Sequence, residues 1–409
     1  MSKLAHAIPG LDDIDVAGKR VLLRVDFNVP LTDSGTIADD SRLRASLPTI
    51  RNLLDRGAAV IVATHLGRPG GRPRPGLSTR VLAQPLAELL GRDVAWVGDC
   101  IGPEVEARVK ELRSGQVLLL ENLRFHPEEE ANDPGFAGEL AGLGEAYVND
   151  AFAAAHRAHA STEAVAEMLP AAAGRLMAEE VTQLGGLLDS PRRPLLAIIG
   201  GSKLSTKLGV LTHLVDKVDT LCLGGAMAAT FLKAAGLEVG TSLVEDDFLD
   251  RALELVSQAT RQGVGLELPV DVVVAPSAEA PDAEVGVKAV QELGAEDMIM
   301  DLGPETLRRW EPLVEGAGTA VWNGPLGLCE QPRFARGTER LARALAASSA
   351  LTVTGGGDLL AALQRLGLQD SFTHVSTGGG ATLEFLEGRS LPGVAALEKA
   401  AGAAPRRPR

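Results

Sequence analysis

Five apolar segments in the second half of the chain each run directly into a glycine-containing turn, a pattern that narrows the possible folds sharply. The segments are LLAIIGGSK, TLCLGGAMA, TAVWNGPLG, LTVTGGGDL and THVSTGGGA. In a parallel sheet the carboxyl ends of the strands meet at one edge, where ligands bind. Glycine at that edge lets backbone N–H groups approach a phosphate, and each following helix presents its positive N-terminus. The pattern predicts a nucleotide site, whereas a single turn of this kind is often only structural.

The first half alternates short apolar segments with longer helical patterns, which is typical of βαβ units and a parallel sheet. A chain of 409 residues also exceeds the roughly 250–300 residues at which single cores stop growing. We therefore predict an α/β protein with two Rossmann-like three-layer domains and a ligand cleft between them. The predicted boundaries are an N-terminal domain 1–173, an interdomain hinge helix within 174–190, a C-terminal domain 191–388 and a terminal segment 389–409. The tail AAGAAPRRPR is expected to be disordered.

Charge and cysteine usage exclude several classes of protein. The net charge of −14 argues against nucleic acid as a partner, because phosphate backbones need a basic face. No apolar run approaches the ~18 residues of a membrane span, and the first residues lack the apolar core of a secretory signal, so we expect a cytoplasmic protein. Cys100, Cys222 and Cys329 are far apart and form no C-x-x-C, so neither disulfides nor a thiolate metal site is indicated. A monomer is the default expectation.

Cations and hydrogen-bonding groups recur at the strand ends and turns of the first half. Arginine suits phosphate and carboxylate because its planar fork donates in pairs and keeps its charge. The pattern predicts a site for a small polyanion, and the alternative is scattered surface charge. Asp26 could instead only cap a turn. Ordinary surface or packing roles are the alternative for His126, His156 and His159. A solvated helix face is expected for Arg44, Arg51 and Arg56. The candidate residues are Asp26, Asn28, Arg42, His65, Arg68, Arg124 and Arg157.

Lys203 and Lys207 follow the first glycine pair of the second half, four residues apart. We expect both near the start of the next helix. Two like charges beside a positive helix end repel unless an anion lies there. The pattern therefore favours a phosphate contact over the alternative of a helix face exposed to water.

Many segments resemble phosphoglycerate kinase motifs, in order, from residue 24 to residue 388. They include RVDFNVP, HLGRP, LENLRFHPEE, VNDAF, AHRAHAS, GGSKLSTKL, GGAMAATFL, DLGPET, VWNGPLG, GGGD and STGGGATLEFLEG. Neither G-x-x-x-x-G-K-[ST] nor G-x-G-x-x-G is present, so a P-loop enzyme and a dinucleotide dehydrogenase are not supported. The resemblance implies reversible phosphoryl transfer from 1,3-bisphosphoglycerate to ADP, giving 3-phosphoglycerate and ATP.

The resemblance also implies roles for individual residues. The seven candidates of the first half would hold phosphoglycerate, Asp358 would hold the Mg²⁺ of Mg-ADP or Mg-ATP, and Glu330 would meet the ribose. Arg42, Lys203, Gly378 and Gly379 would act in catalysis, with Gly380 beside them. The nucleotide-binding set would be Lys203, Lys207, Gly224, Gly225, Asn323, Pro325, Glu330, Gly357 and Asp358.

The implied chemistry needs no general base, because a carboxylate with a pKa near about 3.5 is ionised at neutral pH. Catalysis then rests on positioning and fixed cations. Leu359, Ser202, Ala226 and Ala153 depart from the expected pattern, and Leu359 puts a hydroxyl contact to the nucleotide in doubt. The alternatives are a kinase for another acyl phosphate or carboxylate, and a non-catalytic anion-binding protein.

Overall fold

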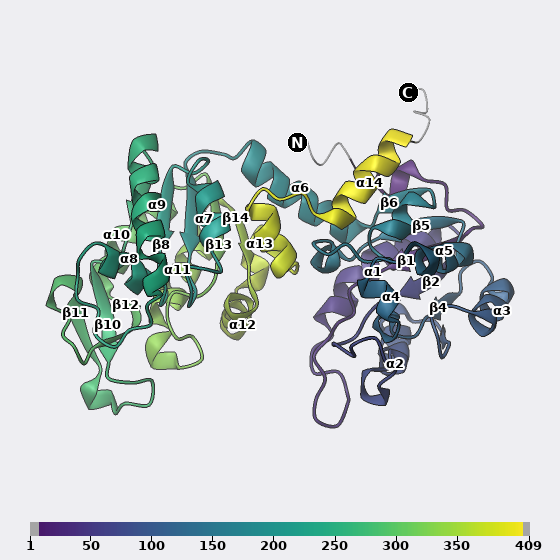
Figure 1. Cartoon of the computed structure of the whole chain (residues 1–409), viewed down its shortest axis with the longest axis horizontal. Helices are drawn as coiled ribbons and strands as arrows, with labels where there is room; N and C mark the ends of the chain where they lie inside the picture. Colours follow the sequence, from purple (N-terminus) through teal and green to yellow (C-terminus); the bar gives the residue numbers. More distant parts are fainter. Residues whose placement is uncertain (1–7, 404–409) are drawn as a thin grey trace. The chain divides into compact units, whose positions relative to one another are not determined.

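The computed structural model describes residues 8–403, which form two compact units. The first unit comprises the chain up to Gly185 and the segment from Ser390 onward, and the second runs from Gly186 to Arg389. The boundary falls inside α6 (Arg175–Asp189), where the sequence predicts the connecting helix (Figure 1). The end of the chain thus groups with the first unit. The cleft and the substrate assigned to each domain stay predictions, and most of the predicted disordered tail lies outside the described residues.

A parallel sheet organises the first unit, and in the described part of the chain its strand order is β3-β4-β2-β1-β5-β6. The strands are β1 (Arg20–Arg24), β2 (Ala59–Ala63), β3 (Val94–Trp96), β4 (Val117–Leu119), β5 (Ala146–Asn149) and β6 (Ala171–Ala173). The helices that belong entirely to this unit are α1 (Ser41–Asp55), α2 (Arg80–Leu90), α3 (Pro103–Glu111), α4 (Pro127–Glu130), α5 (Pro134–Leu143) and α14 (Pro392–Ala403).

Alternation along the strands explains the core of this unit. Val21 and Leu23 of β1 share a buried cluster with apolar residues of α1 such as Leu43 and Ile50. The intervening Leu22 is also buried, so both faces of the strand are covered. Strands buried on both faces are expected in a parallel sheet, because crossover helices pack on each side.

The second unit contains another parallel sheet, with the order β15-β14-β13-β7-β8-β9 among the described residues. Its strands are β7 (Leu195–Ile199), β8 (Thr220–Leu223), β9 (Gly265–Glu267), β13 (Thr319–Asn323), β14 (Leu351–Gly355) and β15 (His374–Ser376). The five glycine-ended segments supply all of these except β9, which confirms their placement as parallel strands of one sheet. Its helices are α7 (Leu208–Leu214), α8 (Ala228–Ala234), α9 (Leu249–Gln262), α10 (Pro304–Glu315), α11 (Arg336–Ala347), α12 (Gly357–Leu366) and α13 (Gly380–Leu386).

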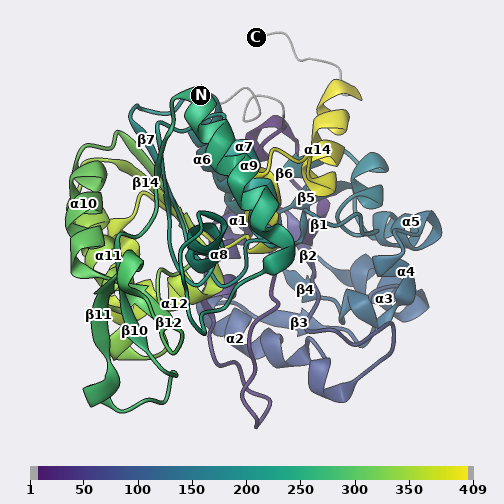
Figure 2. The same ribbon diagram turned by 60° about the vertical axis from the view of Figure 1, so that its left-hand side comes forward.

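The second unit also contains an antiparallel sheet in the order β11-β10-β12, which the sequence pattern does not predict (Figure 2). The strands are β10 (Asp271–Ala275), β11 (Gly286–Ala289) and β12 (Met298–Leu302). Val272 and Val274 of β10 share a buried cluster with Ala229 and Leu232 of α8. This small sheet is therefore anchored to the larger layer by α8.

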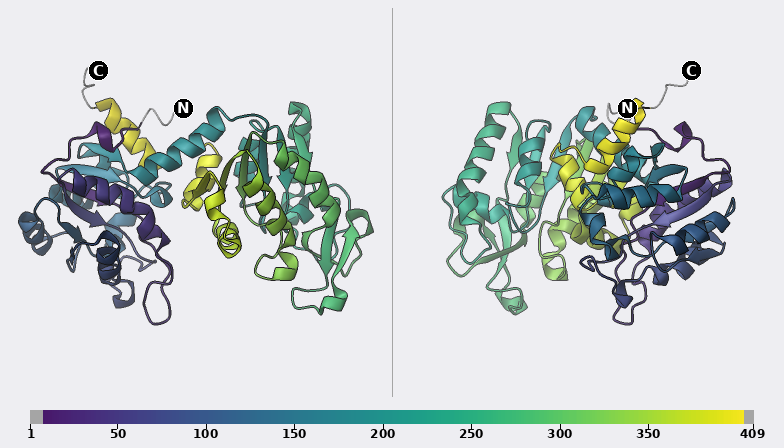
Figure 3. Two further views of the ribbon diagram at one scale, coloured as in Figure 1. Left: turned by 180° about the vertical axis from the view of Figure 1, so that it is seen from behind. Right: turned by 45° about the vertical axis from the view of Figure 1, so that its right-hand side comes forward.

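The last helix, α14, completes the first unit (Figure 3). It packs against β6 and the turn Ala164–Glu167, with Leu397 fully buried. The Gly393 N–H donates to the Ala155 carbonyl at 2.9 Å, and Lys399 Nζ lies 3.0 Å from Glu167 Oε1. Residues more than 200 positions apart in the chain thus close one core.

Among the described residues, no helix combines the length and the apolar character that a membrane span requires. The expected cytoplasmic location and monomeric state stay predictions.

Candidate functional site

The carboxyl ends of neighbouring strands bring most of the first-half candidates together. β1 pairs with β2 and with β5, so the segments that follow these strands emerge at the same edge of the sheet. Asp26 follows β1 and His65 follows β2, and both are nearly inaccessible to solvent. Arg124 follows β4 in a short turn, Leu123–Phe125, and its N–H donates to the Asn122 side chain, which caps this turn. The sheet topology therefore positions these groups on one edge, as the sequence predicts.

Direct contacts join Asp26, Asn28 and Arg42. Arg42 is the second residue of α1, and its Nη1 donates to Asp26 Oδ2. Asp26 Oδ1 also accepts the Asn28 N–H at 3.2 Å, so Asp26 both caps a turn and holds the guanidinium. Asn28 Oδ1 accepts the Gly67 N–H at 2.8 Å, and the Gly67 carbonyl accepts from Arg124 Nη1 at 3.1 Å. These bonds link the loops after β1, β2 and β4.

Arg24 lies at the centre of this cluster, although the sequence reasoning did not select it. Its side chain is completely buried at the end of β1. Nε donates to Ser161 Oγ at 2.8 Å, and Ser161 Oγ donates in turn to Glu129 Oε1 at 2.6 Å. Arg24 Nη2 lies 3.1 Å from His65 Nδ1. A cation inside an apolar strand is the sequence signal that points to such a residue, because buried charges need partners.

Burial, together with the nearby arginines, keeps the two buried histidines uncharged. Burial, together with Arg24, Arg124 and Arg42, lowers the pKa of His65 well below its usual range. Burial and the nearby arginines also lower the pKa of His159 to about 3. Both imidazoles are therefore neutral at physiological pH. Since Arg24 Nη2 can only donate, His65 Nδ1 accepts, and Nε2 carries the proton that remains available to a ligand.

Other first-half candidates take different positions. Arg68 and Arg157 are exposed, and Arg157 Nε lies 3.2 Å from His156 Nε2. Within residues 8–403, no hydrogen bond or ion pair joins Arg68 to the cluster. His159 is a buried packing residue beside Glu129, at 3.8 Å, and Arg44 is an exposed residue paired with Asp40. These positions agree with the alternative roles, which were packing for His159 and a solvated helix face for Arg44.

Close backbone packing explains the glycines at the sheet edge of the second unit. A Cβ on Gly225 would lie 2.6 Å from both Gly201 N and Gly201 O, and its φ of +69° is in the left-handed region. A Cβ on Gly200 would lie 2.1 Å from the Pro325 carbonyl oxygen. One on Gly224 would meet the Leu326 side chain at 2.6 Å. The turns after β7, β8 and β13 thus pack backbone against backbone, which no larger residue allows.

Lys207 belongs to this edge and directly precedes α7, which begins at Leu208, as expected for a residue near the helix start. For Lys203 this expectation is wrong, because it lies earlier in the loop before α7. Lys207 Nζ donates to Asn323 Oδ1, and Asn323 Nδ2 donates to the Gly355 carbonyl at 2.9 Å. Burial lowers the pKa of Lys207, whereas the carboxylate of Asp358 acts in the opposite direction. Lys203 is exposed.

The remaining candidates line the starts of two helices and one loop. Gly357 and Asp358 are the first two residues of α12, and both are exposed. Gly379, with φ +54°, precedes α13, which starts at Gly380, and Gly378 is buried beside it. Glu330 is exposed in the loop after β13. Leu359 is fully buried in the core with α10 and α11, so this position serves packing.

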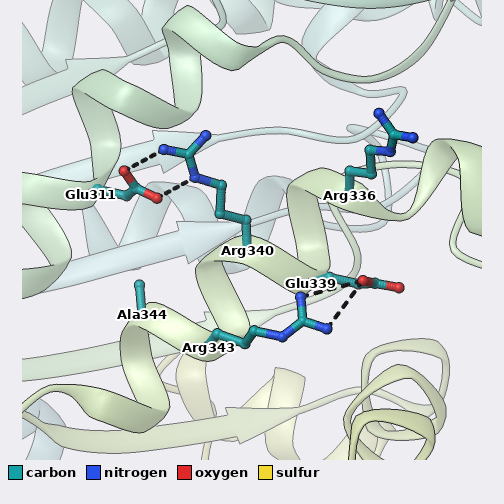
Figure 4. A pocket seen from close by; sticks show the side chains of 6 residues that line it. All are labelled: Glu311, Arg336, Glu339, Arg340, Arg343 and Ala344. Atoms are coloured by element: carbon teal, nitrogen blue, oxygen red, sulfur yellow. Dashed lines mark hydrogen bonds and ion pairs between the residues drawn. The ribbon is translucent and has the colours of Figure 1, made fainter.

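A separate hollow of about 480 Å³ lies over α10 and α11, away from these residues (Figure 4). Arg340 forms two hydrogen bonds with Glu311, and Arg343 pairs with Glu339. Exposed ion pairs of this kind are common on helix surfaces. None of the sequence-predicted site residues lines this hollow.

Comparisons with known proteins agree on one family. The family model described as phosphoglycerate kinase matches residues 11–389. The chain is 55% identical over 389 residues to a phosphoglycerate kinase of Moorella thermoacetica, covering 95% of this chain and 98% of the relative. It is 53% identical over 393 residues to one of Chloroflexus aurantiacus, covering 95% and 98%. The solved phosphoglycerate kinase of Coxiella burnetii superposes with a TM-score of 0.89 at 41% identity, covering 96% of this chain and 100% of that chain.

Proposed function

This chain belongs to the phosphoglycerate kinase family and is a kinase, and we propose that its two units divide the substrates between them. Its reaction is the reversible transfer of a phosphoryl group from 1,3-bisphosphoglycerate to ADP, giving 3-phosphoglycerate and ATP, a step of glycolysis and, in reverse, of gluconeogenesis. In the proposal the first unit holds the phosphoglycerate and the second holds the nucleotide. The phosphoryl acceptor in the ATP-consuming direction is the carboxyl group of 3-phosphoglycerate.

The observation that carries the first assignment is the buried cluster of Arg24, Arg124 and neutral His65, with Arg42 beside it. Such a cluster attracts a small anion with several acceptor oxygens, because guanidinium groups donate in pairs and are already desolvated. His65 adds an Nε2–H donor without adding charge. Asp26, Asn28, Arg68 and Arg157 complete the proposed phosphoglycerate set.

The glycine-lined edge of the second unit supports the nucleotide assignment. Its turns after β7, β8 and β13 pack closely against one another, and Lys207 supplies a positive charge held by Asn323. The Asp358 carboxylate is exposed at the start of α12 and influences Lys207 electrostatically, which suits an oxygen ligand for Mg²⁺ shared with substrate phosphates. Bound there, Mg²⁺ would neutralise phosphate charge. Gly224, Gly225, Pro325, Glu330 and Gly357 complete the proposed nucleotide set.

The proposed mechanism relies on orientation. An ionised carboxylate, or the β-phosphate oxygen of ADP, attacks without a base, so the protein has to align the reactants and stabilise the equatorial oxygens. We assign this task to Arg42, Lys203 and the backbone at Gly378 and Gly379. Direct transfer also requires the two bound substrates to meet, and we propose that α6 provides the hinge for that motion.

A coupled assay tests the reaction and its specificity. ATP formation from ADP is measured with 1,3-bisphosphoglycerate and with acetyl phosphate at equal concentrations. We expect kcat/KM for 1,3-bisphosphoglycerate to be higher by orders of magnitude, because acetyl phosphate has no second phosphate to meet the arginines. Equal values for the two donors would contradict the proposed phosphoglycerate site.

Arg42→Ala tests the role assigned to the start of α1. We expect kcat to fall by about 10²-fold or more, by analogy with the loss of one fixed transition-state donor, with Mg-ADP affinity unchanged. Arg44→Ala is the matched control, because Arg44 lies on the same helix but is exposed and paired only with Asp40. Wild-type turnover in Arg42→Ala would remove this residue from the mechanism.

A further inference from the structure

Three potential metal ligands of different chemistry converge in the first unit, outside the proposed substrate sites. They are the carboxylate of Asp99, the thiol of Cys100 and the imidazole of His126, and their ligand atoms all lie within 4.8 Å of one another. Asp99 and Cys100 follow β3, whereas His126 comes from the segment that joins the end of β4 to α4. Because Cys100 and His126 are 26 positions apart in the sequence, their spacing gives no sign of this group.

The donor set indicates which kind of ion would fit. Thiolate and imidazole together with one carboxylate oxygen suit Zn²⁺, whereas Mg²⁺ prefers oxygen ligands only. We propose that Asp99, Cys100 and His126 form a binding site for one Zn²⁺ ion, with water as the fourth ligand. This site is distinct from the Mg²⁺ of the nucleotide, which would bind in the other unit.

The geometry requires only small shifts. His126 Nε2 and Asp99 Oδ1 are 2.7 Å apart and share a hydrogen bond. Around a tetrahedral Zn²⁺, ligand atoms stand roughly 3.3–3.8 Å apart, as the usual zinc–ligand distances require. The two side chains therefore have to separate by less than about 1 Å and the sulfur has to approach. Asp99 and His126 have room for this, since 50% and 26% of their side chains are exposed.

Cys100 lies on the buried side of the proposed site. Its side chain is completely buried, and its backbone N–H donates to Asp99 Oδ1 at 2.7 Å. The exposed edges of Asp99 and His126 leave an entry path for the ion and for a water ligand. The ring of His126 also packs against Phe136, with centroids 5.3 Å apart, which restricts its orientation.

Zn²⁺ would bind the thiolate form of Cys100, so binding would displace the thiol proton.

Titration of the full, untagged chain after chelator treatment tests the proposal. Zn²⁺ is added in competition with a chromogenic chelator, and Co²⁺ serves as a spectroscopic probe. We expect one Zn²⁺ per chain, a cobalt–thiolate charge-transfer band, and a Zn²⁺-dependent rise in the melting temperature. The variants are Asp99→Asn, Cys100→Ala and His126→Gln, and each should weaken binding by about tenfold or more, as a lost ligand does.

Cys329→Ala is the matched control, because Cys329 is also a buried thiol but hydrogen-bonds to Thr338. It should bind Zn²⁺ like the parent chain. If Cys100→Ala fails to fold, the proposal is tested with Asp99→Asn and His126→Gln, which change partly exposed side chains. The cobalt spectrum of the parent chain then tests the thiolate ligand. The proposal is overturned if the parent chain binds no Zn²⁺, if the charge-transfer band is absent, or if His126→Gln binds Zn²⁺ as tightly as the parent chain.

Discussion

Replacing Asp150 by Asn is expected to stabilise the first unit at neutral pH and to remove a pH dependence of its stability. Asp150 follows β5 and is completely buried. Its Oδ1 accepts the N–H groups of Leu176 and Met177 at the start of α6, at 2.9 and 3.3 Å. Within the described residues, Oδ2 has no hydrogen-bond partner. The cap on α6 thus depends on one oxygen of a carboxyl that water cannot reach.

Burial raises the pKa of Asp150 from 3.8 to about 7, although the bonds from Thr49, Met177 and Leu176 act against this rise. At pH values between 3.8 and about 7, Asp150 is protonated in the folded protein but ionised in the unfolded chain. The contribution of Asp150 to the free energy of unfolding is therefore fully present below about pH 4, and it is lost as the pH rises through 7. At 1.4 kcal/mol per unit, a shift of about three units corresponds to a loss of about 4 kcal/mol.

Asp150→Asn keeps the Oδ1 acceptor and cannot ionise. Below about pH 4 the variant and the parent chain should be similarly stable, which provides an internal control. Above about pH 7 the variant should be more stable by up to about 4 kcal/mol. The free energy of unfolding is measured in urea over this pH range from the fluorescence of Trp96, in a background with Trp310 and Trp322 replaced by Phe. A difference that stays constant with pH would refute the reasoning.

Three further substitutions test packing that the structure makes explicit. Gly174→Ala should destabilise the first unit by about 1–3 kcal/mol or more, because its Cβ would lie 2.1 Å from Asp150 Oδ1, and unchanged urea unfolding would contradict this. Arg24→Met should cost about 3–5 kcal/mol by removing the cation that most favours the charged form of the buried Glu129. Adding Glu129→Gln should recover part of that loss in the same measurement. Gly225→Ala should lower the free energy of unfolding by about 1–2 kcal/mol because of its left-handed φ, with a further loss from the backbone clash. Calorimetry should also show weaker Mg-ADP binding, and wild-type affinity would exclude Gly225 from the nucleotide site.

Strand positions and the sheet edge could be predicted from the sequence because they depend on local patterns. Each glycine-ended strand carries its own signal, an apolar run and a turn that only glycine permits, as at Gly225. The strands that escaped prediction lack such signals. β6 is the tripeptide Ala171–Ala173, and most of the strands β9 to β12 have no glycine turn after their last residue.

The parts of the site that the sequence missed depend on contacts between distant residues. Arg24 gains its role from Ser161 and His65, which are 137 and 41 positions away. Lys203 lies farther from the start of α7 than expected, because a GG turn need not lead directly into a helix. Here Lys207 instead reaches Asn323 on β13, a contact that no local pattern reveals.

The return of α14 to the first unit has a consequence for how this protein is made. α14 follows the whole second unit in the chain, so the surface of β6 that α14 packs against remains open until residues 392–403 have left the ribosome. The second unit, by contrast, is complete once Arg389 has emerged. The half that is synthesised first is therefore the half that finishes folding last, and a fragment ending at Gly185 would lack part of its own core.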